Sequence, residues 1–247
     1  MKNRYQLLDS IRGIVLISMI LYHATWNMVY IYGREWDWYK SPAAYVWQQS
    51  ICWTFILLSG FCFSLGKRHM KNGGLVFGAG LIVTLVTLIA IPQNRVIFGV
   101  LTCIGSCILL VTFMEKILEK VVPMWGMVGS FVLFLMTKGI NYGYIGMKEG
   151  FRILLPSSWY DDYLTTYFGF PFKEFYSTDY FSFFPWIFLY LTGFYLFRIV
   201  DKKRGWESPV LQIKIPVVNF LGQHSLLIYL LHQPIIYGLQ EVVINYI

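Results

Sequence analysis

The sequence predicts an all-α, polytopic membrane helix bundle with about seven transmembrane helices and a cytoplasmic N-terminus. Three observations support this prediction. First, 57% of the 247 residues are hydrophobic and only 13% are charged, roughly half the charged fraction of a soluble domain. Second, the apolar residues form seven runs, most of them near the ~20 residues that a helix needs to cross a bilayer. Third, basic residues concentrate in alternate connections between these runs.

The predicted spans follow one another along the chain with one long connection. They are residues 11–32, 43–66, 74–92, 95–114, 122–138, 181–199 and 217–241. The run at 122–138 is the shortest, at the lower limit of the ~17–25 residues that span a bilayer. The first run has a basic flank, as a signal peptide does, but Trp26, Asn27 and Tyr30 stand where small residues would mark cleavage, so we expect a retained helix. We expect one domain over residues 1–247.

The distribution of Lys and Arg predicts the orientation. The N-terminal segment and three loops hold 13 of the 20 basic residues, in 1–12, 67–73, 115–121 and 198–216. The positive-inside rule assigns this side to the cytoplasm. An odd number of spans then places the C-terminus outside a multi-pass cell-membrane protein. Positive charge clustered in this way argues against a nucleic-acid-binding face.

The connection at 139–180 is too polar to span and is rich in aromatic residues. Its rings are Tyr142, Tyr144, Trp159, Tyr160, Tyr163, Tyr167, Phe170 and Tyr176. Long connections without secondary structure are uncommon unless they are functional. One interpretation is an interfacial aromatic belt with short re-entrant or interfacial helices. The other is a lid or acceptor platform on the outer face.

The four cysteines predict neither a disulfide framework nor a metal site. Cys52, Cys62, Cys103 and Cys107 all fall inside apolar runs, where thiols act as small hydrophobic residues. Cys103 and Cys107 share a helical face, but no His or carboxylate joins them at metal-ligand spacing.

The first helix carries the strongest candidate set, because ionisable groups inside spans are costly and mark functional sites. Asp9, Arg12, His23 and Asn27 lie on one helical face. Arg12 and His23 are about 16 Å apart along the axis, which favours an anionic carrier at Arg12 whose arm reaches His23. The guanidinium group of arginine can donate two parallel hydrogen bonds to a phosphate. The imidazole of histidine, with a pKa near neutrality, can abstract a proton. The alternative is a topology anchor at Arg12 and an interhelical polar contact at His23.

The last helix carries a second polar set. Tyr229 and His232 share a face, Gln233 is adjacent, and His232 lies at a depth similar to that of His23. Pro234 removes one backbone hydrogen bond and leaves a carbonyl free near these side chains. These residues form either part of a site or a polar contact that holds a kinked helix in the bundle.

Two more candidates lie at the outer end of the sixth span. Asp179 can orient a histidine or accept a hydrogen bond from a substrate hydroxyl, or it can cap that helix. Trp186 lies just inside the span. His69, in a basic loop, is expected to be solvated.

Five segments together resemble one family. They read RYQLLDSIRGIVLISMILYH (4–23), FILLSGFCFSLG (55–66), FGVLTCIGSCILL (98–110), STDYFSFFPWIFLYLTG (177–193) and LGQHSLLIYLLHQPII (221–236). Each is mostly apolar, but the five occur in order over nearly the whole chain. The sequence is similar to the heparan-α-glucosaminide N-acetyltransferase-like membrane acyltransferases, in a superfamily that includes the acyltransferase-three O-acetyltransferases.

The resemblance implies an acyl-CoA-dependent acyltransferase. Members move an acyl group, usually acetyl, from cytosolic acetyl-CoA to an acceptor sugar at or across the membrane. It implies that His23 is catalytic and that Arg12 and Asp9 are the motif's structural and carrier-binding pair. His23 is expected either to deprotonate the acceptor for direct attack on the thioester or to carry the acyl group briefly itself. With the residue-level reasoning, the expected roles are catalytic for His23, His232 and Asp179, carrier-binding for Arg12, Asp9, Arg4, Lys67 and Arg68, and acceptor-binding for Asn27, Trp186, Tyr229 and Gln233, with no metal.

The expected partners are acyl-CoA, a carbohydrate acceptor and membrane lipid, with a homodimer left open. Within the enzyme class, O-acylation of an exported polysaccharide or lipid is the alternative to N-acetylation. Outside it, the alternatives are a proton-coupled small-solute transporter, for which inverted repeats or broken helices would be expected, and a non-catalytic anchor for a partner. The sequence departs from the animal enzymes, since we expect no soluble luminal region before the first span and residues 26–42 contain no histidine.

Overall fold

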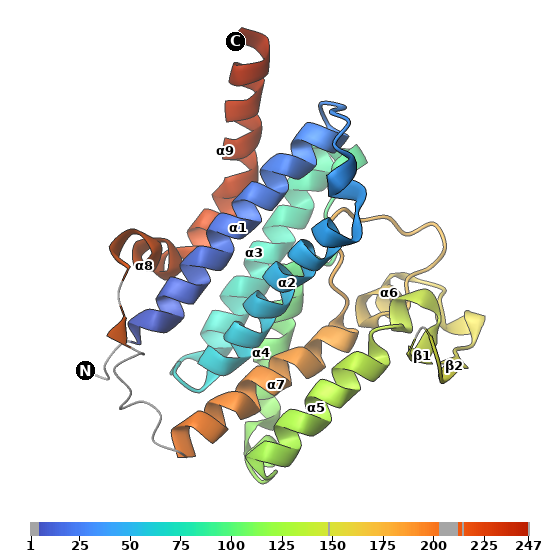
Figure 1. Cartoon of the computed structure of the whole chain (residues 1–247). Coiled ribbons are helices and arrows are strands. Elements are labelled where there is room, and N and C mark those ends of the chain that lie inside the picture. The colour runs from blue at the N-terminus through green and yellow to red at the C-terminus, as the bar shows by residue number, and fades with distance from the viewer. Residues whose placement is uncertain (1–4, 148, 203–211, 214, 247) are drawn as a thin grey trace. The chain divides into compact units, whose positions relative to one another are not determined.

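The computed structural model describes residues 5–147, 149–202, 212–213 and 215–246, and these are predominantly helical (Figure 1). Within them lie nine α-helices, four short 3-10 helices and one two-stranded sheet. Seven of the helices are long and apolar enough to cross a membrane. The predicted seven-span helix bundle is therefore confirmed, and the chain is a multi-pass membrane protein.

The long helices follow the predicted spans closely. They are α1 (Gln6–Tyr30), α2 (Pro42–Phe63), α3 (His69–Ala90), α4 (Val100–Leu118), α5 (Pro123–Thr137), α7 (Phe183–Lys202) and α9 (Ser225–Tyr246). The shorter helices are α6 (Tyr163–Phe168), α8 (Pro216–Gln223), η1 (Asp37–Lys40), η2 (Pro92–Asn94), η3 (Ile140–Tyr142) and η4 (Ser157–Trp159).

Two of the predicted spans differ from the structure. The run at 95–114 becomes helical only at Val100, because Gly99 before it is extended. The run at 217–241 is two helices, since α8 ends at Gln223 and α9 begins after His224. The residues on both sides of this break are mostly apolar, so hydropathy alone predicts one continuous span.

The chain divides into two compact units. The first unit contains α1, η1, α2 as far as Phe55, α8 and α9. The second contains α2 from Ile56 and the elements from α3 to α7. The first unit brings α1 and the start of α2 together with α8 and α9 from the C-terminal part of the chain, whereas the second is one continuous stretch of sequence.

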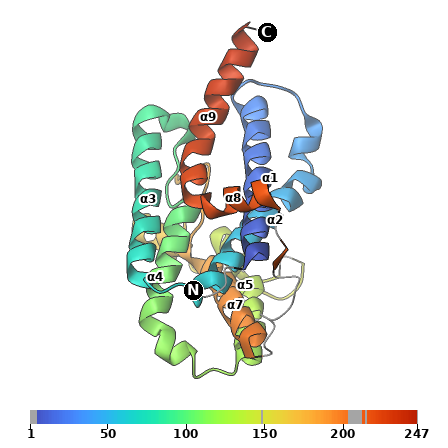
Figure 2. The ribbon, with the colours of Figure 1, turned by 90° about the vertical axis from the view of Figure 1, so that its left-hand side faces the viewer.

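In the first unit, α8 packs on the N-terminal half of α1 and leads into α9 (Figure 2). The helices approach closely at two glycines, because a Cβ on Gly13 would overlap the Val218 carbonyl and one on Gly222 would overlap the Asp9 carbonyl. Beside them, the Ser10 hydroxyl donates to Asn219 Oδ1 at 2.5 Å. Small residues allow such close backbone contacts between membrane helices. This contact fixes where α9 starts relative to α1.

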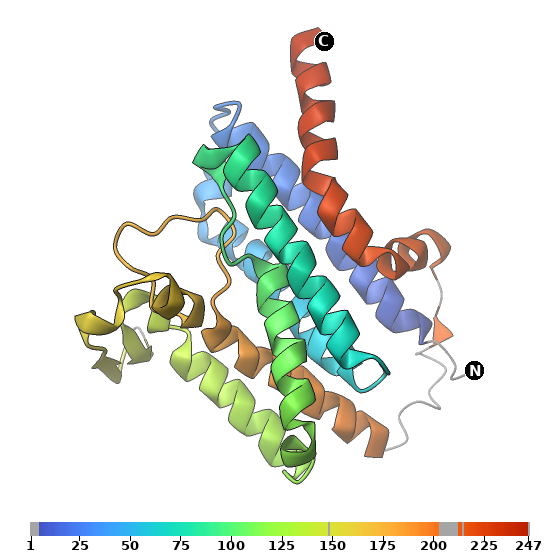
Figure 3. The same ribbon diagram turned by 180° about the vertical axis from the view of Figure 1, so that it is seen from behind.

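In the second unit, α3 packs along α4 and α5 along α7 (Figure 3). A Cβ on Gly105 of α4 would meet the backbone of Phe77 on α3, and one on Gly193 of α7 would meet the Leu57 carbonyl of α2. Between α5 and α7, the Ser130 and Thr192 hydroxyls lie 3.1 Å apart. Small residues and interhelical hydroxyl bonds therefore hold this unit together.

The connection at 139–180 is folded rather than structureless. Strands β1 (Tyr144–Gly146) and β2 (Arg152–Leu154) pair antiparallel, and α6 begins with a reciprocal capping box between Asp162 and Thr165. Tyr167 donates to Ser106 Oγ at 2.5 Å. The short helices were predicted here, whereas the β-hairpin was not, because its strands are only three residues long.

Burial raises the pKa of both Tyr167 and Tyr180 in this connection. Both phenols therefore remain protonated at physiological pH and act as hydrogen-bond donors. Tyr180 donates to the Thr166 carbonyl at 2.5 Å. These two bonds join α6 to α4 and to the segment that precedes α7.

One exposed, apolar face of α9 indicates what surrounds the helices. Leu227, Leu231, Ile235 and Leu239 follow each other at intervals of four residues and are 46–64% exposed. An apolar stripe of this length would be unfavourable in water. We expect lipid to cover it, as it covers the outward faces of membrane helices.

Candidate functional site

Two histidines from opposite ends of the chain meet in the first unit. The ring centroids of His23 on α1 and His232 on α9 lie 4.9 Å apart, with the planes inclined at 56°. His232 is 8% exposed, and His23 is half-buried. The similar depth predicted for these residues is therefore confirmed as a direct ring contact inside two membrane spans.

The hydrogen bond of His232 defines which of its nitrogens is available. Its Nδ1 lies 2.5 Å from the carbonyl oxygen of Tyr229. A carbonyl only accepts, so Nδ1 carries the hydrogen, and the neutral ring presents a lone pair at Nε2. That Nε2 atom is buried and has no hydrogen-bond partner among the described residues. The ring is thus oriented to accept a proton or to act as a nucleophile.

A buried amide network beside the histidines joins α1 to α9. Asn27, fully buried, donates to Gln240 Oε1 and accepts from Gln233 Nε2, both at 2.9 Å. Gln240 also donates to the Ala24 carbonyl at 2.9 Å. The network fixes the register of α9 against α1. It also leaves Gln233 Oε1 buried without a hydrogen-bond partner among the described residues.

Gln240 is a member of this network that the sequence reasoning missed. It stands seven residues after Gln233, which is two helical turns and therefore the same face. That spacing is the signal that could have found it. Asn27 and Gln233, predicted to bind the acceptor, are brought together, although chiefly as partners of each other and of Gln240.

The predicted pairing of Asp9 with Arg12 is confirmed. Arg12 Nη1 lies 3.0 Å from Asp9 Oδ1 and 3.5 Å from the carbonyl oxygen of Gly222. Asp9 is 5% exposed, and Arg12, which neutralises it, also links α1 to α8 through the Gly222 carbonyl. Binding of a carrier by Arg12 remains a prediction. Lys67 and Arg68 are exposed between α2 and α3, and Arg4 lies outside the described residues.

The remaining candidates belong to the second unit. Asp179 accepts a hydrogen bond from the backbone N–H of Val100 at 3.3 Å, so it caps α4 rather than the sixth span, which begins at Phe183. Trp186 is 8% exposed and packs against aromatic rings of the unit's core. Their catalytic and acceptor-binding roles remain predictions. His69 is half-buried, and its ring stacks on that of Phe63 with the centroids 4.0 Å apart, so it is only partly exposed to solvent.

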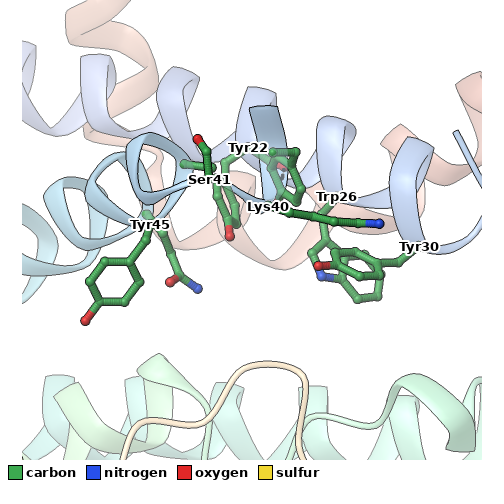
Figure 4. Close-up of a pocket in the computed structure, with 9 residues that line it drawn as sticks. Tyr22, Trp26, Tyr30, Lys40, Ser41 and Tyr45 are labelled. Atoms are coloured by element: carbon green, nitrogen blue, oxygen red, sulfur yellow. Dashed lines mark hydrogen bonds between the residues drawn. The ribbon is translucent and has the colours of Figure 1, made fainter. Parts of the chain in front are cut away.

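An open cavity of about 290 Å³ lies where the C-terminal half of α1, η1 and the start of α2 meet (Figure 4). We call it the aromatic pocket. The nine residues that line it are Tyr22, Trp26, Tyr30, Tyr39, Lys40, Ser41, Ala44, Tyr45 and Gln48. The sequence reasoning missed this pocket, although Tyr22, Trp26 and Tyr30 recur every four residues on one face of the first helix.

Comparison with known proteins identifies the family of the chain. Residues 4–234 match the family model described as heparan-alpha-glucosaminide N-acetyltransferase, catalytic. No curated protein and no solved structure matches the chain. The matched region includes both His23 and His232 and covers nearly all of the sequence. The chain therefore belongs to the heparan-alpha-glucosaminide N-acetyltransferase catalytic-domain family of membrane acetyltransferases.

Proposed function

We propose that this protein moves an acetyl group from cytosolic acetyl-CoA to an amine or hydroxyl of a carbohydrate acceptor. The contact between His23 and His232 supports this proposal most strongly, because it places two titratable rings together within the family match. In the proposal, residues 1–247 act as one domain in the cell membrane. The N-terminus is cytoplasmic and the C-terminus is outside, as the basic loops predict.

The chemistry assigned to the pair is general base catalysis. The acceptor's lone pair attacks the thioester carbonyl carbon while His232 Nε2 takes the proton from the attacking N–H or O–H. The carbon–sulfur bond then breaks, CoA leaves as its thiolate, and the proton held by His232 passes to that sulfur. His23, in contact with His232, lies where it can orient the ring or share the proton.

Arg12 is the proposed contact for the donor's phosphates. It is partly exposed at 23%, and the ~16 Å between Arg12 and His23 along α1 leaves room for the pantetheine arm. Lys67 and Arg68 fall on the same predicted side of the membrane. We propose that they attract the anionic donor to that side by long-range electrostatics.

A donor-binding experiment tests this assignment. Because Asp9 is buried, removing Arg12 alone would leave an uncompensated carboxylate, so we would compare wild type with the double variant Asp9→Asn/Arg12→Gln. In detergent-purified protein we expect acetyl-CoA binding to weaken at least tenfold, the loss expected for a charge-assisted hydrogen bond. The His23→Ala variant should bind as wild type does. Titration calorimetry would measure all three affinities.

The control is Lys173→Gln, which removes an exposed cation on the predicted outer side and should leave the affinity unchanged. Unchanged binding by the Asp9→Asn/Arg12→Gln variant would remove Arg12 from the donor site. Absence of acetyl-CoA binding by wild type would contradict the acetyltransferase proposal itself.

A further inference from the structure

The β-hairpin of the second unit exposes large apolar side chains. Strands β1 and β2 are only three residues long, and an isolated hairpin is at best marginally stable in water. Five apolar side chains on the hairpin or beside it are 53–81% exposed, and we call them the hairpin patch: Tyr142, Met147, Phe151, Ile153 and Leu154. Proteins rarely leave such patches uncovered, so we expect a partner to cover this one.

The patch extends over both faces of the hairpin. Successive residues of a strand point to opposite faces, so Phe151 and Ile153 lie on one face and Leu154 lies on the other. All three residues of β2 are exposed. An antiparallel pair with one face in water would alternate apolar and polar residues. Apolar side chains on both faces instead fit a hairpin that is immersed in an apolar medium.

The base of the hairpin is fixed to the C-terminal end of α5. Strand β1 contacts α5, and Figure 1 shows the hairpin at that end of the helix. A Cβ on Gly139, which follows α5, would overlap the ring of Tyr144. The Tyr160 hydroxyl donates to the Ile140 carbonyl at 2.6 Å. The hairpin patch is therefore held at a defined position directly after a membrane span.

The exposed face of α5 leads up to the hairpin. Val128, Val132 and Leu135 are 42–50% exposed and recur at intervals of four and three residues, so they lie on one helical face. The candidate span that contains α5 extends to Tyr142, and β1 starts two residues later. The hairpin thus begins where the hydrocarbon core ends. Tyrosine is enriched at this depth, and the long side chain of Arg152 can reach from it into water.

The backbone of the hairpin limits how deeply it can enter the bilayer. A sheet of two strands leaves one edge of each strand outside the ladder, and an open sheet edge is not stable in hydrocarbon. The headgroup region offers hydrogen-bond partners to these edges. The apolar side chains can reach the acyl chains from there, as those of interfacial helices do.

We propose that the hairpin patch is a membrane anchor, inserted at the boundary between headgroups and acyl chains in the leaflet where α5 ends. This is the outer leaflet in the orientation that the basic loops predict. The anchor fixes the depth of the α5 end in the bilayer. It assigns the hairpin to the membrane interface rather than to a lid over a site, and it does not depend on the proposed acetyl transfer.

Nitroxide labels on the full-length protein test this proposal. One label would be placed at Phe151→Cys or Leu154→Cys in a Cys52→Ala/Cys62→Ala background, since the other two cysteines are buried. Both labelled positions are exposed, so neither substitution removes a core contact. In nanodiscs of phosphatidylcholine and phosphatidylglycerol, paramagnetic resonance would measure how often each label collides with oxygen, which concentrates in lipid, and with a water-soluble nickel chelate.

Two reference positions in the same unit calibrate the result. Val132→Cys reports lipid, and Asp161→Cys reports water at an exposed, charged position of the same connection. At Phe151 and Leu154, the ratio of oxygen to nickel collisions should be several-fold above that at Asp161 and close to that at Val132. A ratio equal to that at Asp161, at either position, would overturn the anchor. Few collisions with either reagent would also overturn it, because protein would then cover the patch, as a lid or a second copy would.

Discussion

Replacing His232 with glutamine is expected to lower acetyl transfer by about 10²–10⁴-fold, the contribution typical of a general base. Glutamine retains a hydrogen-bond donor for the Tyr229 carbonyl, but it offers no basic nitrogen in place of Nε2. The measurement is the initial rate of acetyl transfer at saturating acetyl-CoA. Donor affinity should remain close to wild type, because the change affects the chemical step.

His224→Gln is the matched control for this prediction. His224 is exposed, and its Nδ1 lies 2.9 Å from the Phe220 carbonyl, so it shares the same kind of backbone contact without the burial. Its rate should equal that of wild type. A His232→Gln enzyme that keeps more than about a tenth of the wild-type rate would exclude His232 as the base, since a base contributes at least about 10².

The second large effect is expected at Gly222. Alanine there places a Cβ against the Asp9 carbonyl of α1, and because the obstacle is backbone rather than a flexible side chain, α8 must move away. Overpacking of this kind typically costs about 1–3 kcal/mol of folding free energy. Thermal unfolding in a single detergent should show a lower midpoint. The acetyl-transfer rate should fall too, because α8 sets the start of α9 and hence the position of His232.

Gly238→Ala provides the comparison within the same unit. A Cβ at Gly238, in α9, would meet nothing within 4 Å. Alanine is favoured over glycine in a helix by roughly 0.5–1 kcal/mol, so this variant should unfold at the wild-type midpoint or slightly above it. Equal midpoints for Gly222→Ala and Gly238→Ala would show that the α1–α8 contact is not as close as the structure describes.

Part of this structure could be predicted from the sequence because it depends on local patterns. Hydropathy located the seven spans, and helical periodicity placed Asp9 beside Arg12 and His23 at the depth of His232. The contact between the two histidines required tertiary structure. It depends on the glycine-mediated packing of α8 on α1 and on the amide network around Asn27, which joins residues more than 200 positions apart.

Other features were missed because they too depend on contacts between residues far apart in the sequence. The predicted span at 217–241 breaks into two helices at His224, and mean hydropathy over the whole run does not reveal this break. Asp179 caps α4, which begins 79 positions earlier in the chain. Its position just before the sixth predicted span had suggested that it caps that span instead. The aromatic pocket forms only when η1 brings Tyr39 and Lys40 back against α1.

The central claim, acetyl transfer to a sugar, is tested most directly with acetyl-CoA labelled in its acetyl group. Purified wild-type protein would be incubated with this donor and a panel of amino and neutral saccharides, and the products would be analysed for label. We predict label on an acceptor amine or hydroxyl in the wild type and none above background in His232→Gln. Label on no saccharide, together with proton-coupled solute uptake into proteoliposomes, would contradict the account and indicate a transporter.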